Sequence, residues 1–157
     1  MTTLPTSALM IYFNDYEQYH QHKFNGACHM VGVPAVSMSL IGLLSYVVLW
    51  SPSVDFGLEA LFKVDLGILA VLWGAIFAFR VDRQLAIPYS IFSYLVYLTT
   101  RHLPINILLG VQVVGWTLQI TGHYFYEKKF PSWINIFSHL FIGPMWIFSK
   151  MIGYYKV

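Results

Sequence analysis

Residues 29–50, "HMVGVPAVSMSLIGLLSYVVLW", decide the fold class. The stretch contains no Asp, Glu, Lys or Arg, and most of its side chains are apolar. A helix that rises about 1.5 Å per residue would measure about 33 Å over these positions, enough to cross a hydrocarbon core about 30 Å thick. Residues 29–50 therefore predict a first membrane span.

The composition of the whole chain indicates the same class. Among 157 residues, 57% are hydrophobic, 18% aromatic and 10% charged, and the mean hydropathy is +0.61. Soluble domains carry about 25% charged residues, so we expect an integral membrane protein. The net charge of +2 comes from nine basic and seven acidic residues scattered between apolar runs. Without a strongly basic surface, nucleic acid is excluded as a partner.

Further apolar runs follow at short intervals and leave no room for a separate soluble unit. We expect an all-α fold, a polytopic transmembrane helix bundle of four to five spans that forms one domain over residues 1–157. The predicted spans are residues 29–50, 60–79, 85–100, 105–121 and 133–149. Gly143 and Pro144 interrupt the last run, which either crosses the membrane or kinks and returns.

The amino-terminal segment has an aromatic stripe at helical spacing, made of Leu9, Tyr12, Phe13, Tyr16 and His20. The stripe predicts an amphipathic helix over residues 7–27 that lies at the membrane interface. Its tyrosines either anchor the chain at headgroup depth or shape a site, and the sequence leaves both alternatives open.

Histidines gather near one predicted membrane surface. Counting crossings places four of them there: His20, His22, His29 and His123. His139 enters the last span below that surface, whereas His102 falls at the opposite face. Imidazole is the commonest metal ligand and is costly to desolvate. A metal site and a set of histidines bonded to carbonyls or lipid phosphates are therefore both compatible with the sequence.

Spacing limits how these histidines could meet. His20 and His29 are too far apart to form one helical ligand pair, so tertiary packing must bring them together. Glu127 follows His123 by four residues and could bind a metal, orient a ligand or pair with Lys128 or Lys129. Five basic residues on the amino-terminal side, against four opposite, favour a cytosolic site.

Two blocks resemble the 2-hydroxy fatty acid dioxygenase family, whose members are small multi-span membrane proteins. "YHQHKFNGACHMVGVP" (19–34) is similar to its first motif through Tyr19, His20, Asn25, His29 and Pro34. "GWTLQITGHYFYEKKFP" (115–131) is similar to its second motif through Gly115, Trp116, Gln119, Gly122, His123, Glu127, Lys128 and Pro131. With Pro144 in the last span, the resemblance covers nearly the whole chain.

The resemblance implies an iron(II) enzyme of fatty acid α-oxidation that uses dioxygen to shorten 2-hydroxy fatty acids by one carbon. Such acids arise, for example, from phytosphingosine breakdown. The implied catalytic and metal-binding residues are His20, His29 and His123, with Glu127 and Asn25 beside them. Two further candidates for metal binding or for support of the ligands are His139, which does not fall on a family motif position, and His102, whose predicted face conflicts with this role.

The resemblance also implies partners and a location. The carboxylate and hydroxyl of a 2-hydroxy acid could chelate iron at open positions. Lys128, Lys129 or Arg83 could hold the carboxylate first, or could bind lipid headgroups instead. The expected location is the endoplasmic reticulum membrane in a eukaryote or the inner membrane in a bacterium, with the bilayer supplying the substrate. The oligomeric state stays open.

Two other classes remain as alternatives. A haem-binding electron carrier could use His29 and His123, or His139, as axial ligands. A transporter or structural membrane protein could use the histidines to bind protons or one another. A di-iron desaturase is set aside, because the chain has no His-x-x-x-His or His-x-x-His-His box.

Overall fold

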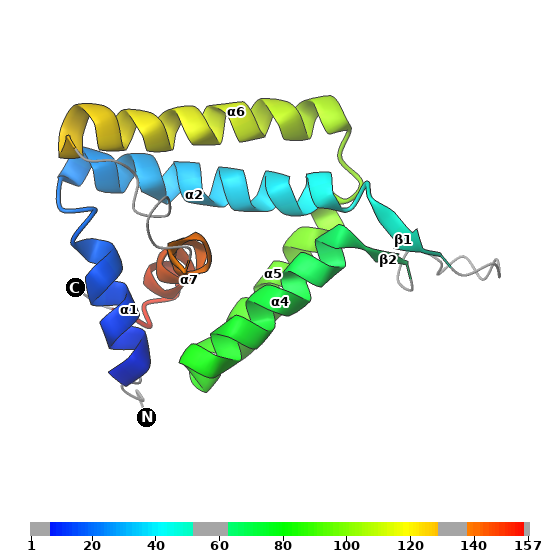
Figure 1. The fold of residues 1–157 in the computed structure, drawn as a ribbon, viewed down its shortest axis with the longest axis horizontal. Coiled ribbons are helices and arrows are strands. Elements are labelled where there is room, and N and C mark those ends of the chain that lie inside the picture. The colour runs from blue at the N-terminus through cyan, green and yellow to red at the C-terminus, as the bar shows by residue number, and fades with distance from the viewer. Residues whose placement is uncertain (1–6, 52–62, 129–137, 156–157) are drawn as a thin grey trace.

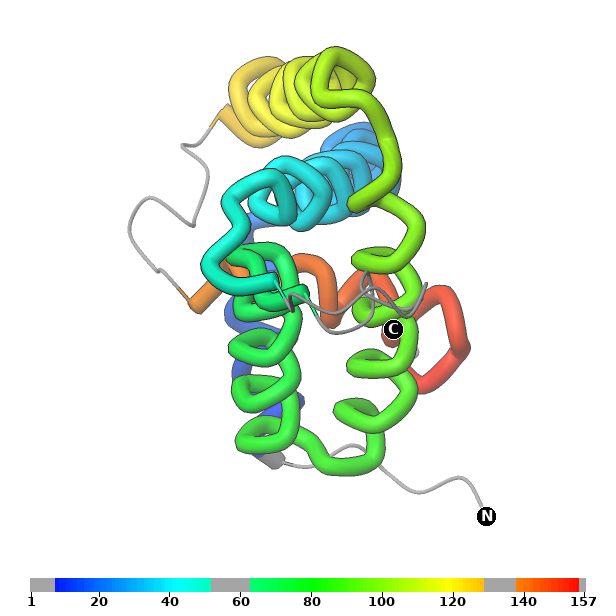
Figure 2. The backbone as a smooth tube through the Cα atoms, turned by 90° about the vertical axis from the view of Figure 1, so that its right-hand side faces the viewer, coloured from blue at the N-terminus to red at the C-terminus, as the bar shows by residue number. Residues whose placement is uncertain are grey.

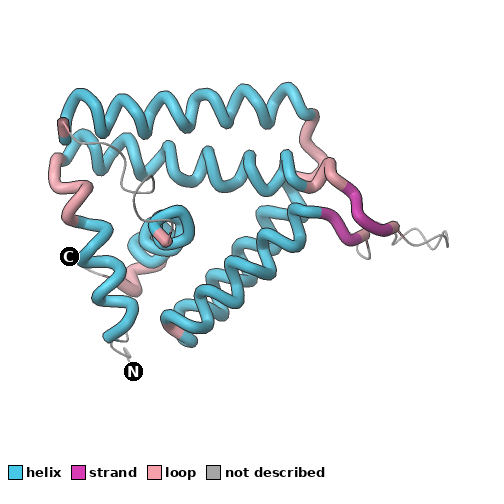
Figure 3. Tube along the Cα trace, in the orientation of Figure 1, coloured by secondary structure: helices cyan, strands magenta, loops and turns pink. Residues whose placement is uncertain are grey.

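A computed structural model describes residues 7–51, 63–128 and 138–155, and these residues are mostly helical. In chain order the elements are α1 (Ser7–Glu17), α2 (Lys23–Leu44), β1 (Val48–Trp50), β2 (Val64–Asp65), α4 (Leu66–Val81), α5 (Arg83–Thr100), α6 (Ile105–Thr121), the π-helix η1 (Gly122–Glu127) and α7 (His139–Met151). Figure 3 shows the helices with the short strand pair at one end of α2. Parts of the predicted second and fifth spans lie outside the described residues.

Helix α2 is at the centre of the arrangement. It packs most extensively against α6, which runs beside it in the opposite direction (Figure 1). Helices α1, α4, α5 and α7 lie on the other side of α2, as the view turned by 90° also shows (Figure 2). Helix α7 is seen end-on in Figure 1, so it runs crosswise to α2 and α6. The crosswise packing brings α7 and the amino-terminal end of α2 together.

Glycines allow the close approach of α2 and α6. A Cβ atom added at Gly115 would lie 2.8 Å from Val36 Cγ2 and 3.0 Å from the Val36 backbone nitrogen. A Cβ at Gly32 would lie 3.0 Å from the Gly115 carbonyl oxygen. Small residues commonly permit such backbone contact between membrane helices. The α2–α6 interface, which carries two parts of the site described below, therefore depends on these glycines.

We expect Gly115→Ala to lower the stability of the protein by about 1–3 kcal/mol, because the new methyl group must displace α2. A lower thermal unfolding midpoint in detergent would measure this effect. Gly110→Ala is the matched control on the same helix, because a Cβ at Gly110 meets no atom within 4 Å. Equal midpoints for the two variants would contradict the proposed packing.

Helices α4 and α5 form a hairpin whose starts are fixed by two buried carboxylates. Asp65 accepts a hydrogen bond from the Ile68 backbone N–H at 2.9 Å and begins α4. Asp82 accepts from the N–H groups of Gln84 at 2.9 Å and Leu85 at 3.0 Å and begins α5. Both satisfy N–H groups that a helix start leaves without partners.

The hydrophobic core joins the hairpin turn to α1 and α7. Leu9, Phe13 and Tyr16 provide the buried face of α1, and they pack in one cluster with α7 and with the residues around Val81 and Leu85. The aromatic stripe predicted for the amino-terminal segment therefore forms part of the core. This packing attaches α1 firmly to α7.

The predicted helix boundaries require correction at the amino-terminal end. The helix expected over residues 7–27 is two helices, because α1 ends at Glu17 and α2 begins at Lys23. His20 donates from Nδ1 to the Tyr16 carbonyl at 2.7 Å, and the His22 side chain accepts from the Phe24 N–H at 3.2 Å. These two side chains satisfy backbone groups at a helix end and a helix start, so the chain turns between them.

The other predicted spans agree with the helices to different degrees. The first span is shifted toward the amino terminus, because the helix runs over Lys23–Leu44 instead of residues 29–50. Residues 48–50 form β1, which pairs with β2. The fourth prediction, residues 105–121, coincides with α6. Among the described residues, two helices are long and apolar enough to cross a membrane, Lys23–Leu44 and the continuous helix Ile105–Glu127, and Leu66–Val81 is a shorter apolar helix. The total of four to five spans stays a prediction, as does the interfacial position of α1.

Candidate metal centre

Three histidines from three different segments meet at one end of the α2–α6 pair. His20 lies in the turn after α1, His29 in α2 and His123 in η1. Their ring centroids are 4.3 Å apart for His20 and His29, 4.7 Å for His29 and His123, and 5.0 Å for His20 and His123. One nitrogen from each ring lies within 4.8 Å of the others. Two imidazoles on one ion, with bonds of about 2.1 Å, place their nitrogens up to about 4.2 Å apart, so the three rings are nearly in position to share a metal.

Backbone hydrogen bonds orient two of these rings. His20 donates from Nδ1 to the Tyr16 carbonyl, and His29 donates from Nδ1 to the Asn25 carbonyl at 3.0 Å. A carbonyl only accepts, so Nδ1 carries the proton in both rings and each Nε2 has a free lone pair. This arrangement is typical of histidines that bind metals.

Two nitrogens of the cluster are buried without a hydrogen-bond partner among the described residues. They are His20 Nε2 and His123 Nδ1. A buried polar atom normally has a partner, so two unpartnered nitrogens in rings that contact each other require an explanation. A bound metal ion would satisfy both, and the three residues fit one.

Burial keeps the His20 ring neutral. It lowers the pKa of His20 from 6.5 to about 3, and the hydrogen bond to the Tyr16 carbonyl opposes this only in part. Tyr16 also stacks on the His20 ring, with centroids 4.1 Å apart. At neutral pH His20 is therefore in the form that binds metals. Of the two roles left open for the tyrosines, Tyr16 shapes this site.

The pocket at the cluster is small. Its volume is about 30 Å³, and its walls include Trp116 and Gln119 of α6 and Leu140, Gly143 and Pro144 of α7. A cavity needs about 10–15 Å³ to hold one water, so there is room for an ion and a few atoms. A haem between His29 and His123 does not fit, because these rings are 4.7 Å apart and His20 lies against both.

The π-helix places Glu127 against the start of α2. Its Oε1 accepts from the His22 backbone N–H at 2.7 Å and from Asn25 Nδ2 at 3.1 Å. Both contacts are to the start of α2, and neither is to one of the three clustered histidines. Short π-helical turns frequently occur at functional sites. Here the π-helix contains both His123 and Glu127, and Glu127 bonds the start of the segment that carries His29.

Asn25 links the parts of the site without belonging to the histidine cluster. It is fully buried, and its Nδ2 also donates to the Tyr19 carbonyl at 3.3 Å. Gly122 lies directly against it, since a Cβ on Gly122 would collide with Asn25 Oδ1. Asn25 therefore positions His29 through its backbone carbonyl and Glu127 through its side chain.

The sequence model described as "2-hydroxy-palmitic acid dioxygenase Mpo1-like" matches residues 7–155. The chain belongs to the Mpo1-like family. The matched region contains all three clustered histidines, and the resemblance noted from the two motifs is confirmed. Comparison with curated proteins and with solved structures finds no match for this chain.

The other histidines of this Mpo1-like protein lie outside the cluster. His139 lines the pocket, but its Nε2 lies 2.8 Å from Asp15 Oδ2. His22 is exposed and stacks on Tyr126. His102 lies in the turn before α6, and the length of α6, about 25 Å, separates it from His123. His102 therefore cannot share a metal with the other three.

The basic residues predicted to hold the substrate carboxylate are dispersed. Lys128 is exposed directly after η1, with its backbone in the left-handed region at φ 54°. Arg83 begins α5 at the hairpin turn and does not line the histidine pocket. Lys129 lies outside the described residues. Only Lys128 is thus seen next to the site.

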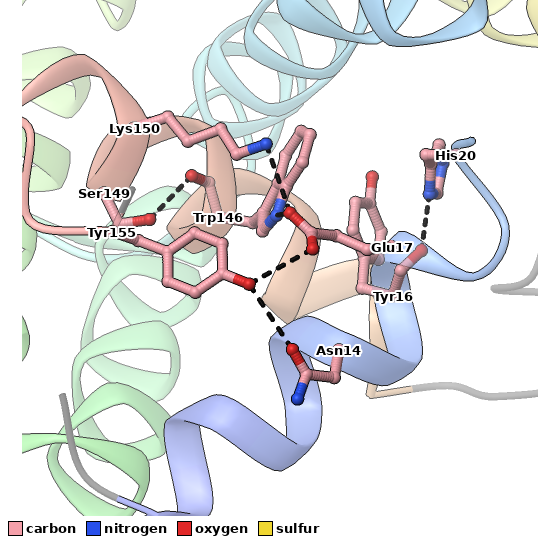
Figure 4. Close-up of polar contacts among 8 residues, drawn as sticks. All are labelled: Asn14, Tyr16, Glu17, His20, Trp146, Ser149, Lys150 and Tyr155. Carbon is pink, nitrogen blue, oxygen red and sulfur yellow. Dashed lines mark hydrogen bonds and ion pairs between the residues drawn. The ribbon is translucent and has the colours of Figure 1, made fainter. Parts of the chain in front are cut away.

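A clamp that sequence reasoning missed holds α1 on α7 (Figure 4). Glu17 accepts from Trp146 Nε1 at 3.0 Å and from the Tyr155 hydroxyl at 3.1 Å, and it pairs with Lys150 Nζ at 3.2 Å. Tyr16, whose carbonyl orients His20, is the neighbouring residue. A carboxylate within an apolar, aromatic segment was the available signal, but the sequence did not reveal its partners in α7.

We expect Glu17→Ala to weaken metal retention by about tenfold, because the loss of the clamp frees α1 and with it His20. Glu17→Gln keeps one acceptor oxygen, for either Trp146 or Tyr155, and should have a smaller effect. Gln18→Ala, at an exposed neighbouring position, is the control. The measurement is the metal content after dialysis, and equal retention by Glu17→Ala and Gln18→Ala would contradict this role.

Proposed function

We propose that this Mpo1-like protein is an iron(II)-dependent dioxygenase that shortens 2-hydroxy fatty acids by one carbon. The observation that carries the proposal is the convergence of His20, His29 and His123, with unpartnered buried nitrogens, at the two motifs shared with the family. Imidazole suits iron, zinc and copper. Zinc has no redox chemistry, and between the other two metals we propose iron because the family resemblance implies it.

The overall reaction balances with one molecule of dioxygen. The bond between C1 and C2 breaks, C2 becomes the carboxyl carbon of the shorter acid, and C1 leaves as carbon dioxide. Dioxygen takes up four electrons, and one water is formed. Iron(II), when bound, would supply open coordination positions for the hydroxy acid and for dioxygen.

The protein's own residues would hold and shield these reactants. Three neutral imidazoles occupy only part of the coordination sphere of an iron ion, so positions remain for small ligands. Trp116, Leu140 and Pro144 line the pocket and limit the access of bulk water, which protects reactive species from side reactions. Lys128, which is exposed directly after η1, would attract the substrate carboxylate, and Lys129 stays a candidate for the same role from the sequence alone.

The surface supports a membrane location for the enzyme. Trp73 on α4 and Val113 on α6 are 63% and 65% exposed, and many further apolar side chains on these helices are also exposed. Water-soluble monomers rarely have such extended apolar surfaces. We therefore propose that these faces contact lipid, in the endoplasmic reticulum membrane of a eukaryote or the inner membrane of a bacterium, with the histidines near the cytosolic surface.

The function can be tested with purified protein in lipid nanodiscs. Supplied with iron(II), dioxygen and 2-hydroxypalmitate, it should produce pentadecanoic acid, detected by mass spectrometry. Palmitate, which lacks the hydroxyl, is the matched control substrate and should remain unchanged. Failure to form pentadecanoic acid with iron bound would overturn the proposed function.

A further inference from the structure

A second, larger cavity adjoins the histidine pocket. Its volume is about 470 Å³, and it lies between α2, α5 and α7. Ser37 of α2 and Pro144 of α7 line both spaces. The two spaces therefore meet where α7 crosses α2.

The sizes of the two spaces exclude a whole fatty acid from the first one. The histidine pocket, at about 30 Å³, admits an ion and a few atoms, so the long tail of a substrate must lie elsewhere. The adjoining cavity falls within the range of about 300–1,000 Å³ that ligand pockets typically have. We propose, on the basis of the function proposed above, that this cavity binds the alkyl tail of the 2-hydroxy acid and selects substrates by chain length.

The walls of the cavity have the chemistry that an alkyl chain requires. Apart from Ser37, Ser93 and Tyr89, the lining that the described residues provide is apolar, and none of its side chains is charged. The Ser37 hydroxyl donates to the Val33 carbonyl at 2.8 Å, so it does not require a polar ligand. Burying one more methylene group strengthens binding by about fourfold, so a long tail would bind far better than a short one.

The cavity is lined by flexible methionines and by buried, less flexible side chains. Three methionines line it, Met30, Met38 and Met151, and their flexible side chains adjust to different shapes. Met30 and Met151 are exposed, which would allow a tail to enter sideways from a bilayer. Val96 and Phe148 are buried in the inner wall. A bulky residue on the inner wall should therefore shorten the space that a tail can occupy.

The test compares a long and a short substrate in variants that fill the cavity. Val96→Trp, and the milder Met38→Phe in case the first variant does not fold, should lower kcat/KM for 2-hydroxypalmitate by about tenfold or more. Turnover of 2-hydroxyoctanoate should stay within about twofold of wild type. Val113→Trp, on an exposed face of α6, is the matched control and should leave both substrates unaffected.

Other outcomes separate this proposal from the proposed function. Suppose that wild type converts both acids while Val96→Trp and Met38→Phe convert them at the same rates as Val113→Trp. In that case the tail site is wrong and the proposed function stands. Equal losses for the long and the short acid would mean that the substitutions do not act through the tail, and would also overturn the tail site. If wild type converts neither acid, anaerobic binding of 2-hydroxypalmitate decides. If wild type binds 2-hydroxypalmitate tightly and Val96→Trp and Met38→Phe weaken this binding, the tail site is supported. If the two variants bind the acid as wild type does, the tail site is overturned.

Discussion

Replacing His29 with alanine is expected to remove bound iron and to abolish turnover of 2-hydroxypalmitate. His29 is buried, its Nδ1 is held by the Asn25 carbonyl, and its ring contacts those of His20 and His123. Loss of residues that merely support metal ligands typically costs about 10–100-fold in affinity, so loss of a ligand should cost at least about 100-fold. His20→Ala and His123→Ala should behave in the same way. Elemental analysis of iron per chain and product formation measure both effects.

Two histidines outside the cluster provide matched controls for these variants. His102→Ala removes an imidazole that lies beyond the far end of α6 and should leave iron content unchanged. His22→Ala removes an exposed ring that caps α2 and should have a mild effect. Equal activity and iron content in all five single variants would contradict the assignment of the metal centre.

Removing the metal should have an effect of similar size. Chelation of iron is expected to abolish turnover of 2-hydroxypalmitate, and addition of iron(II) under anaerobic conditions, followed by oxygen, should restore it. Zinc should occupy the same three imidazoles, because they suit both metals, but zinc has no redox chemistry and should give an inactive protein.

The metal exchange has a decisive control. Zinc-loaded His123→Ala should retain far less zinc than zinc-loaded wild type, which would show that both metals use this cluster. Turnover that continues after complete removal of iron, or that zinc restores, would contradict an iron-dependent reaction.

The helical class and the general position of the site could be predicted from the sequence. The uncharged run at residues 29–50 required a long apolar helix, and counting crossings placed His29 and His123 near the same surface. The boundaries of α6, Ile105–Thr121, were predicted from the extent of the apolar run alone. These predictions depend on local composition and on chain order, which a single sequence contains.

Features that depend on particular hydrogen bonds, or on contacts between distant segments, were not predictable. The break between α1 and α2 depends on side chains that bond backbone groups nearby, so the stripe of apolar residues did not indicate it. The Glu17 clamp joins residues at opposite ends of the chain. The pairing of residues 48–50 with β2 arises from chain geometry that hydropathy does not encode.

The central claim, that one iron binds to the three clustered imidazoles, is tested most directly by X-ray absorption spectroscopy of the iron-loaded protein. The account predicts one iron per chain, with the scattering of three imidazoles in the wild-type spectrum. Any iron that His29→Ala retains should show the scattering of fewer than three imidazoles. A wild-type spectrum without imidazole scattering, or one dominated by a sulfur ligand, would contradict it.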